Sequence, residues 1–202
     1  MCRKPIRGDA ARVLMSGYYA NITVQGPARD DVVAFLKKHG VVAYVSPAAK
    51  GATVVWHEDL ASQEPLAASL SADLNCVALV VMGYGEAVLM YTLYKSGASI
   101  DAYVSSPNEG LELDGPAPEG DARVLAGAFG IDMDHLVARV ERVLRKPARA
   151  NTEYAYAVNR HGELAKALGL PVFAAGSGFN AIEVGELPEG QGFDAGAMVR
   201  TG

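Results

Sequence analysis

The sequence predicts an α+β fold: a ferredoxin-like βαββαβ antiparallel sheet, extended by a β-hairpin and followed by a helical C-terminal part. Two patterns and the composition support this prediction. Over residues 15–106, strand-like and helix-like runs follow the order β-α-β-β-α-β, and two more strand-like runs come after them. Beyond residue 121 the apolar residues recur mainly at helical spacing. Half of the 202 residues are hydrophobic and 20% are charged, as in globular proteins with a substantial core.

The first half of the sheet domain contains three expected strands and one helix. Residues 18–25 are rich in aromatic and β-branched residues, which favours a strand. A helix is expected over 27–39, because acidic residues open it, basic residues close it, and Gly40 suits a left-handed C-terminal cap. Two further strands are expected at 41–46 and 52–57.

The second half begins with a helix that we expect to be capped by Ser62, a residue type favoured at helix N-termini. Its inner face carries leucines four residues apart, namely Leu66, Leu70 and Leu74. The run 76–82 is continuously apolar, which is typical of a strand buried on both faces. Residues 87–94 and 99–104 are expected to form a hairpin.

Residues 107–121 are predicted to be an acidic Pro/Gly linker, because prolines and glycines interrupt every regular pattern there. The helical C-terminal part is expected over 122–187 and to pack on the sheet. It contains helices at 133–146 and from residue 151 or 152 to 168. A last short strand pair is expected at 171–175 and 179–184.

The two ends of the sequence are expected to be flexible. Residues 1–14 are basic but have no periodic apolar face, so we interpret them as a flexible extension rather than as an arm for an acidic partner. Residues 188–202 are predicted to be a flexible tail, because prolines and glycines become frequent from residue 186 onward.

Composition excludes several function classes. The formal net charge of −5 gives no basic footprint for nucleic acid. No apolar run approaches the roughly 20 residues of a membrane-spanning helix, so a membrane partner is not expected. The two cysteines, Cys2 and Cys76, are too few for a disulfide framework and favour a reducing cytoplasm.

One short motif lies where an RNA-binding module would carry its signature. Lys50 and Gly51 stand at the start of the third expected strand, the position of the Lys/Arg-Gly-aromatic signature of RNA-recognition motifs. However, Ala52, Val54 and His57 occupy the positions of the aromatic rings on which bases stack. We therefore do not predict RNA binding.

A second motif, at residues 176–181, matches the pattern G-x-G-x-x-A of dinucleotide-binding turns. We interpret it as an ordinary turn, because a dinucleotide site needs a helix that opens there, whereas the segment that follows is short and contains valine and glycine. The histidines and cysteines also lack the spacing of metal ligands. The sequence therefore predicts no cofactor and no metal site.

The candidate catalytic residues are His57, Glu58 and Asp59, which close the third expected strand. An imidazole beside two carboxylates can carry acid–base chemistry near neutral pH. Neighbouring residues of a strand point to opposite faces, however, so these side chains need not converge. The alternative reading is a polar strand end at the start of a helix.

The candidate ligand-binding residues lie on the expected hairpin. Tyr91, Tyr94, Asp101 and Tyr103 are polar or aromatic and could form a binding surface, since tyrosine is enriched at interfaces. They could equally form an ordinary half-exposed sheet. His161 lies on an apolar helix stripe and is expected to be a buried, satisfied histidine.

Because no catalytic or cofactor motif is complete, we expect a non-catalytic binding or regulatory module. It would act through a sheet face or as a homo-oligomer, so its partner would be a protein or a second copy of the chain. The alternative is a small-molecule enzyme that uses acid–base chemistry around His57. A concave pocket around the catalytic candidates would favour the enzyme, and an exposed apolar patch would favour the module.

Overall fold

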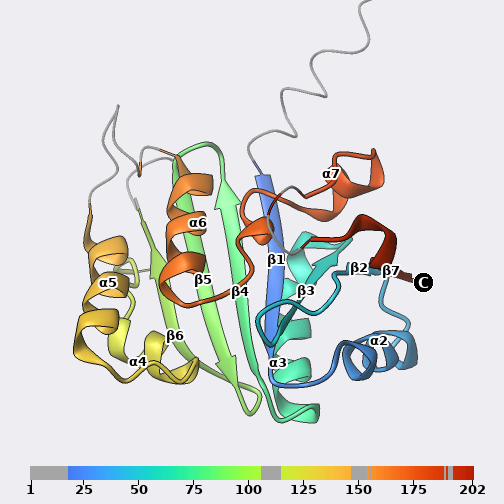
Figure 1. The fold of residues 1–202 in the computed structure, drawn as a ribbon, viewed down its shortest axis with the longest axis horizontal. Coiled ribbons are helices and arrows are strands. Elements are labelled where there is room, and N and C mark those ends of the chain that lie inside the picture. Colours follow the sequence, from blue (N-terminus) through green and yellow to red (C-terminus); the bar gives the residue numbers. More distant parts are fainter. Residues whose placement is uncertain (1–17, 106–114, 147–153, 155, 189, 191–192) are drawn as a thin grey trace, which may run out of the picture.

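The computed structural model describes residues 18–105, 115–146, 154, 156–188, 190 and 193–202. This part of the chain forms a mixed α/β fold around a seven-stranded antiparallel sheet with the strand order β6-β5-β4-β1-β3-β2-β7 (Figure 1). The strands are β1 (Tyr18–Gln25), β2 (Ala43–Val45), β3 (Ala52–His57), β4 (Val77–Tyr84), β5 (Val88–Lys95), β6 (Ala98–Val104) and β7 (Val199–Thr201). The α-helices are α2 (Arg29–Lys38), α3 (Gln63–Asp73), α4 (Ala122–Ala128), α5 (Asp134–Arg145), α6 (Ala157–Ala167) and α7 (Phe179–Glu183). Three short 3₁₀ turns are η1 (Leu60–Ser62), η2 (Val172–Ala174) and η3 (Ala195–Ala197).

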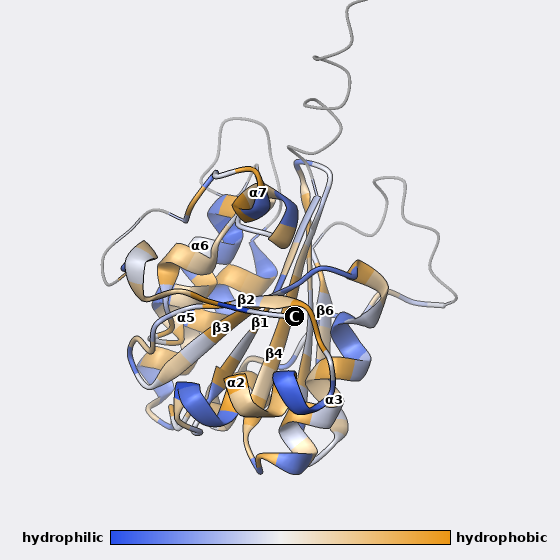
Figure 2. Cartoon of the chain, turned by 90° about the vertical axis from the view of Figure 1, so that its right-hand side faces the viewer, coloured by the Kyte–Doolittle hydropathy of each residue, from blue (hydrophilic) through white to orange (hydrophobic). Residues whose placement is uncertain are grey.

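Helices cover both faces of the sheet. On one face α2 and α3 enclose a core that includes Ile22 and Val80. On the other face α4, α5 and α6 pack over the β4–β6 half, while η2 and α7 pack over Val54 and Trp56 (Figure 1). The strands are mostly hydrophobic in Figure 2, and the helices carry hydrophilic patches. Burial from both sides explains why the β4 sequence is continuously apolar instead of alternating.

The expected strands and helices of residues 18–104 are present, with ends that differ by a few residues. The hairpin between β5 and β6 turns at Ser96 and Gly97, both of which have positive φ angles, 50° and 80°. Two successive left-handed residues are typical of the tightest hairpin turns. The sheet is larger than a βαββαβ unit with one added hairpin, because β7 adds a strand next to β2.

The expected strand pair near residues 171–175 and 179–184 is wrong. The first segment contains the 3₁₀ turn η2, and the second forms the helix α7. In α7 the side chains of Phe179 and Ile182, three residues apart, join the core around Trp56. Short apolar runs fit a strand and a helix equally well by periodicity, and here tertiary packing selects the helix.

The flexible tail expected over residues 188–202 is wrong for its final part, because Val199–Thr201 form β7 and pair with β2. The Thr201 hydroxyl is buried; it donates to the Val41 carbonyl at 2.8 Å and accepts from the Ala43 amide at 3.1 Å. The strand therefore satisfies backbone groups that an open β2 edge would leave unpaired. The expected extension at 1–14 lies outside the described residues.

Only residues 115–121 of the expected acidic linker are described, and they are bonded to the sheet. Glu119 forms a β-bridge with Tyr103, and the Val104 amide donates to the Pro118 carbonyl at 2.9 Å. Asp121 then caps α4 by accepting hydrogen bonds from the amides of Arg123 and Val124. This segment thus lies along the outer edge of β6. Across the described residues, no helix combines the length and apolarity that a membrane span requires.

Candidate functional site

A hollow of about 320 Å³ lies between α2 and α3 at the end of β3, and we call it the His57 hollow. It is lined by aromatic, aliphatic and polar side chains together: Phe35, His39, Gly40, Val41, Val42, His57, Glu58, Ser62, Pro65, Leu66 and Ser69. Two of the three catalytic candidates, His57 and Glu58, are therefore at one concave site.

His57 is the most constrained polar group of this hollow. It is the last residue of β3 and its exposed fraction is 8%. Its Nδ1 lies 2.8 Å from the carbonyl oxygen of Asp59. A carbonyl oxygen can only accept, so Nδ1 carries the proton and Nε2 of the neutral ring is an acceptor. Among the described residues, Nε2 has no hydrogen-bond partner.

The Asp59 side chain is used for local structure. Its carboxylate accepts from the Ala61 amide at 2.9 Å and from the Ser62 hydroxyl at 2.5 Å, which caps η1. These two donors, Ser62 first, hold the pKa of Asp59 below its usual value. Ser62 stands at the N-cap position of α3 as expected, but its side chain makes no capping bond, and its hydroxyl donates to Asp59.

His39 is a residue of the hollow that the sequence did not single out. Its ring packs on Phe35, with the ring centroids 4.4 Å apart. In the sequence it looked like one of the basic residues that close a helix, and only the fold brings the end of α2 next to the end of β3. The sequence contained no local signal that would have linked it to His57.

Three of the four ligand-binding candidates are close together: Tyr91 and Tyr103 are buried, and Asp101 is half-buried. The Tyr91 hydroxyl donates to Asp101 at 2.7 Å, and the rings of Tyr91 and Tyr103 stack with centroids 5.4 Å apart. The two tyrosines are part of the core beneath α4 and α5. Burial raises the pKa of Tyr91 and that of Asp101. Tyr94 lies on the opposite face, in the α2/α3 core, because it is three residues from Tyr91 and side chains alternate along β5.

A second hollow, of about 170 Å³, lies on the α3 side of β4, β5 and β6. Met82 and Met90 are cross-strand neighbours there. Near the same end of β4, Tyr18 and Tyr84 are 48% and 37% exposed and pack edge to face. We call this surface the methionine face and define it by the six residues Tyr18, Met82, Tyr84, Met90, Ala102 and Val104.

The methionine face is bounded by α3, the nearest described helix on this side. The boundary is marked by the Thr92 hydroxyl, which donates to Glu64 of α3 at 2.7 Å. The continuously apolar run of β4 could have indicated that both faces of this part of the sheet are apolar. The predicted ligand-binding residues Tyr91 and Tyr103 point to the other side of the sheet.

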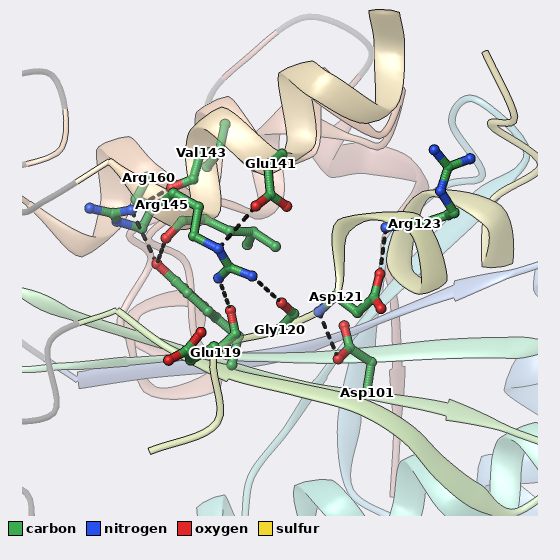
Figure 3. Close-up of polar contacts among 11 residues, drawn as sticks. Asp101, Glu119, Gly120, Asp121, Arg123, Glu141, Val143, Arg145 and Arg160 are labelled. Carbon is green, nitrogen blue, oxygen red and sulfur yellow. Dashed lines mark hydrogen bonds and ion pairs between the residues drawn. The ribbon is translucent and has the colours of Figure 1, made fainter. Parts of the chain in front are cut away.

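Among the described residues, the arginines Arg139, Arg142 and Arg145 of α5 form no ion pair with a carboxylate of residues 115–121. Arg139 and Arg142 are exposed. Arg145 donates to the backbone carbonyls of Glu119 and Gly120, and it forms an ion pair of 3.0 Å with Glu141 of its own helix (Figure 3).

His161 is buried, as expected for a residue on an apolar helix stripe. Its Nδ1 lies 3.3 Å from the Tyr19 hydroxyl, and the two rings are stacked. Burial lowers the pKa of His161 to about 3 and raises the pKa of Tyr19 above its usual value. Both groups are therefore neutral in the folded protein near pH 7, and they belong to the core rather than to either hollow.

Arg160, the neighbour of His161, is also buried. It donates to the carbonyls of Val143 and Lys146 and to the Tyr103 hydroxyl, at the C-terminal end of α5 (Figure 3). Its role is visible only in the fold, because its acceptors are backbone carbonyls at the end of α5 and the hydroxyl of Tyr103 on β6.

The described residues contain no group of three or more His, Cys, Asp or Glu side chains placed to hold a metal ion. Comparison with known proteins finds no matching family model and no significant match among curated proteins or solved structures.

Proposed function

We propose that this protein is a non-catalytic binding module that associates with a second copy of itself through the methionine face. The observation that carries this proposal is an apolar part of the sheet, around Met82 and Met90, that lies beyond the first turn of α3. Clustered apolar residues of this kind are typical of interaction surfaces. Methionine side chains are flexible and polarizable, which suits a surface that packs against another protein.

A second copy is the partner that the charge of this surface favours. None of the six residues that define the methionine face is charged. Glu64, at its border, is engaged by Thr92. The chain as a whole has a formal charge of −5, so the uncharged face is where two copies can approach with the least repulsion. A two-fold interface brings the same patch of both copies together.

Replacing Met82 by glutamate is expected to convert a dimer of the wild-type protein into a monomer, because a carboxylate would be desolvated at the interface centre. The measurement is the molar mass from light scattering during size-exclusion chromatography, over a series of protein concentrations. The matched control is Val184→Glu, on a valine that is 68% exposed on the opposite side of the sheet, just after α7. A monomeric wild type at every concentration, or a dimer unaffected by Met82→Glu, would contradict the proposal.

The second candidate function is a small-molecule enzyme with His57 as the base. It is favoured by the free Nε2 acceptor in a hollow that also contains Glu58. A bound hydroxyl or thiol could lose its proton to this atom. A suitable test is cleavage of 4-nitrophenyl acetate by the wild type and by His57→Phe. Equal rates for the two proteins would count against catalysis by His57.

Within the sheet we infer a ferredoxin-like unit made of β1, α2, β2, β3, α3 and β4. This is supported by the order β4-β1-β3-β2 of its strands and by the position of both helices on one face. We also infer a reducing, cytoplasmic setting. Its support is the buried free thiol of Cys76, whose pKa burial raises to about 11, so that it is unreactive.

A further inference from the structure

His57 presents a fixed hydrogen-bond acceptor that no other described residue uses. Its Nδ1–H is committed to the Asp59 carbonyl, so Nε2 is left with a lone pair at a side chain that is more than nine-tenths buried. We infer that the His57 hollow binds a small molecule with an apolar body and an amine or hydroxyl group that donates to Nε2. This inference does not depend on association through the methionine face.

The lining of the hollow supplies the apolar part of such a site. Phe35 and Leu66 are buried members of the α2/α3 core, and Val41 and Val42 are partly buried beside them. The volume of about 320 Å³ is at the lower end of the range of small-molecule sites, roughly 300–1,000 Å³. The hollow therefore fits a ligand of about the size of a single substituted ring.

The acceptor is held in place by a second layer of hydrogen bonds. The buried side chain of Gln63 donates through Nε2 to the carbonyls of His57, at 3.2 Å, and of Asp59, at 3.4 Å. The Asp59 carboxylate in turn binds Ala61 and Ser62. These contacts fix the carbonyl that selects the His57 tautomer, so the site is organised before any ligand arrives.

The charges at the hollow favour a donor over an anion. The acidic residue Glu58 is one of the lining residues and is exposed. The C-terminal end of α2, at His39 and Gly40, also borders the hollow, and helix C-termini carry partial negative charge. A carboxylate ligand would meet both of these and could not donate to Nε2. An ammonium or hydroxyl group satisfies the acceptor and suits the local potential.

The test uses three probes that share a benzyl group: benzylamine, benzyl alcohol and benzyl methyl ether, which lacks a donor. Binding is followed by NMR through the imidazole signals of the wild-type protein at about pH 8, where an ordinary imidazole is neutral. We expect saturable shifts of the His57 signals with benzylamine and benzyl alcohol, and affinity for the ether about tenfold weaker, the scale of one lost hydrogen bond.

The variant His57→Phe keeps an aromatic ring in the hollow and removes the acceptor. Binding to this variant is followed through the imidazole signals of His39, which also lines the hollow. We expect the variant to bind all three probes as weakly as the wild type binds the ether. The matched control, His135→Phe, changes an exposed histidine on α5 and is expected to bind like the wild type. If His57→Phe does not fold, the comparison of alcohol and ether on the wild-type protein decides alone. Equal affinity for these two probes, or no binding of the alcohol and amine up to their solubility limits, overturns the inference.

Discussion

The variant Arg160→Met is expected to unfold with a free energy about 3–5 kcal/mol lower than that of the wild-type protein. The Arg160 side chain is 1% exposed. It donates to the carbonyls of Val143 and Lys146, and to the Tyr103 hydroxyl at 3.1 Å. Its guanidinium also lies over the Tyr154 ring, 5.0 Å from the centroid. Methionine fills the apolar part of this space but leaves several buried acceptors without a donor.

Urea unfolding, monitored by the circular dichroism of the helices, measures this loss. Arg139→Met is the matched control, because Arg139 is exposed on α5 and its replacement should change stability by no more than about 0.5 kcal/mol. Arg160→Lys is expected to be destabilised as well, since an ammonium cannot reach separate carbonyls as the planar guanidinium does. Equal stability of Arg160→Met and Arg139→Met would show that these bonds contribute nothing.

Acidification is expected to destabilise the folded protein through His161. Burial lowers the pKa of this residue to about 3 in the folded state, whereas an unfolded histidine titrates near about 6.5. The unfolded chain therefore binds a proton at higher pH than the folded protein does. The contribution of neutral His161 to the unfolding free energy is complete above about pH 6.5 and is lost as the pH falls toward 3. At about pH 4.5 this amounts to about 2–3 kcal/mol.

The measurement is the difference in unfolding free energy between about pH 7 and pH 4.5, compared with that of His161→Phe. The variant keeps a ring beside Tyr19 but cannot titrate, so its loss on acidification should be smaller by the His161 contribution. Asp101 acts in the opposite direction, because its raised pKa stabilises the folded state on acidification, and it is present in both proteins. Parallel pH profiles for the two proteins would contradict the prediction.

Local patterns predicted most of the sheet, because the segments that form β1 to β6 are apolar runs bounded by turn or cap residues. They failed where structure depends on a distant partner. β7 has only three residues and exists because β2 offers unpaired backbone groups. α7 has five residues and takes its form from packing around Trp56. Neither element is long enough for periodicity to distinguish strand, helix and loop.

The candidate sites show the same difference between what local sequence patterns predict and what depends on a distant part of the chain. The chemistry of His57 could be anticipated from its residue type, but the free Nε2 depends on where the chain places the Asp59 carbonyl. Tyr91 and Tyr103 were judged from strand alternation, which correctly groups them on one face. Alternation cannot tell that α4 and α5 cover that face. The same alternation places Tyr94, three residues after Tyr91, on the opposite side.

Two arginines, Arg145 of α5 and Arg160 of α6, donate to backbone carbonyls around the C-terminal end of α5, and this affects which substitutions the sequence can accept during evolution. Arg145 and Arg160 bind main-chain carbonyls of Glu119, Gly120, Val143 and Lys146 (Figure 3). Every amino acid supplies that same oxygen, so Glu119 can be exchanged without loss of the acceptor. Gly120 is constrained for a separate reason, since a Cβ atom there would lie 2.5 Å from the Tyr91 hydroxyl. Val143 is constrained as well, because its side chain is buried in the core. The contacts around the end of α5 thus tolerate exchange of an exposed acceptor residue such as Glu119, whereas they depend on the identity of the two arginines.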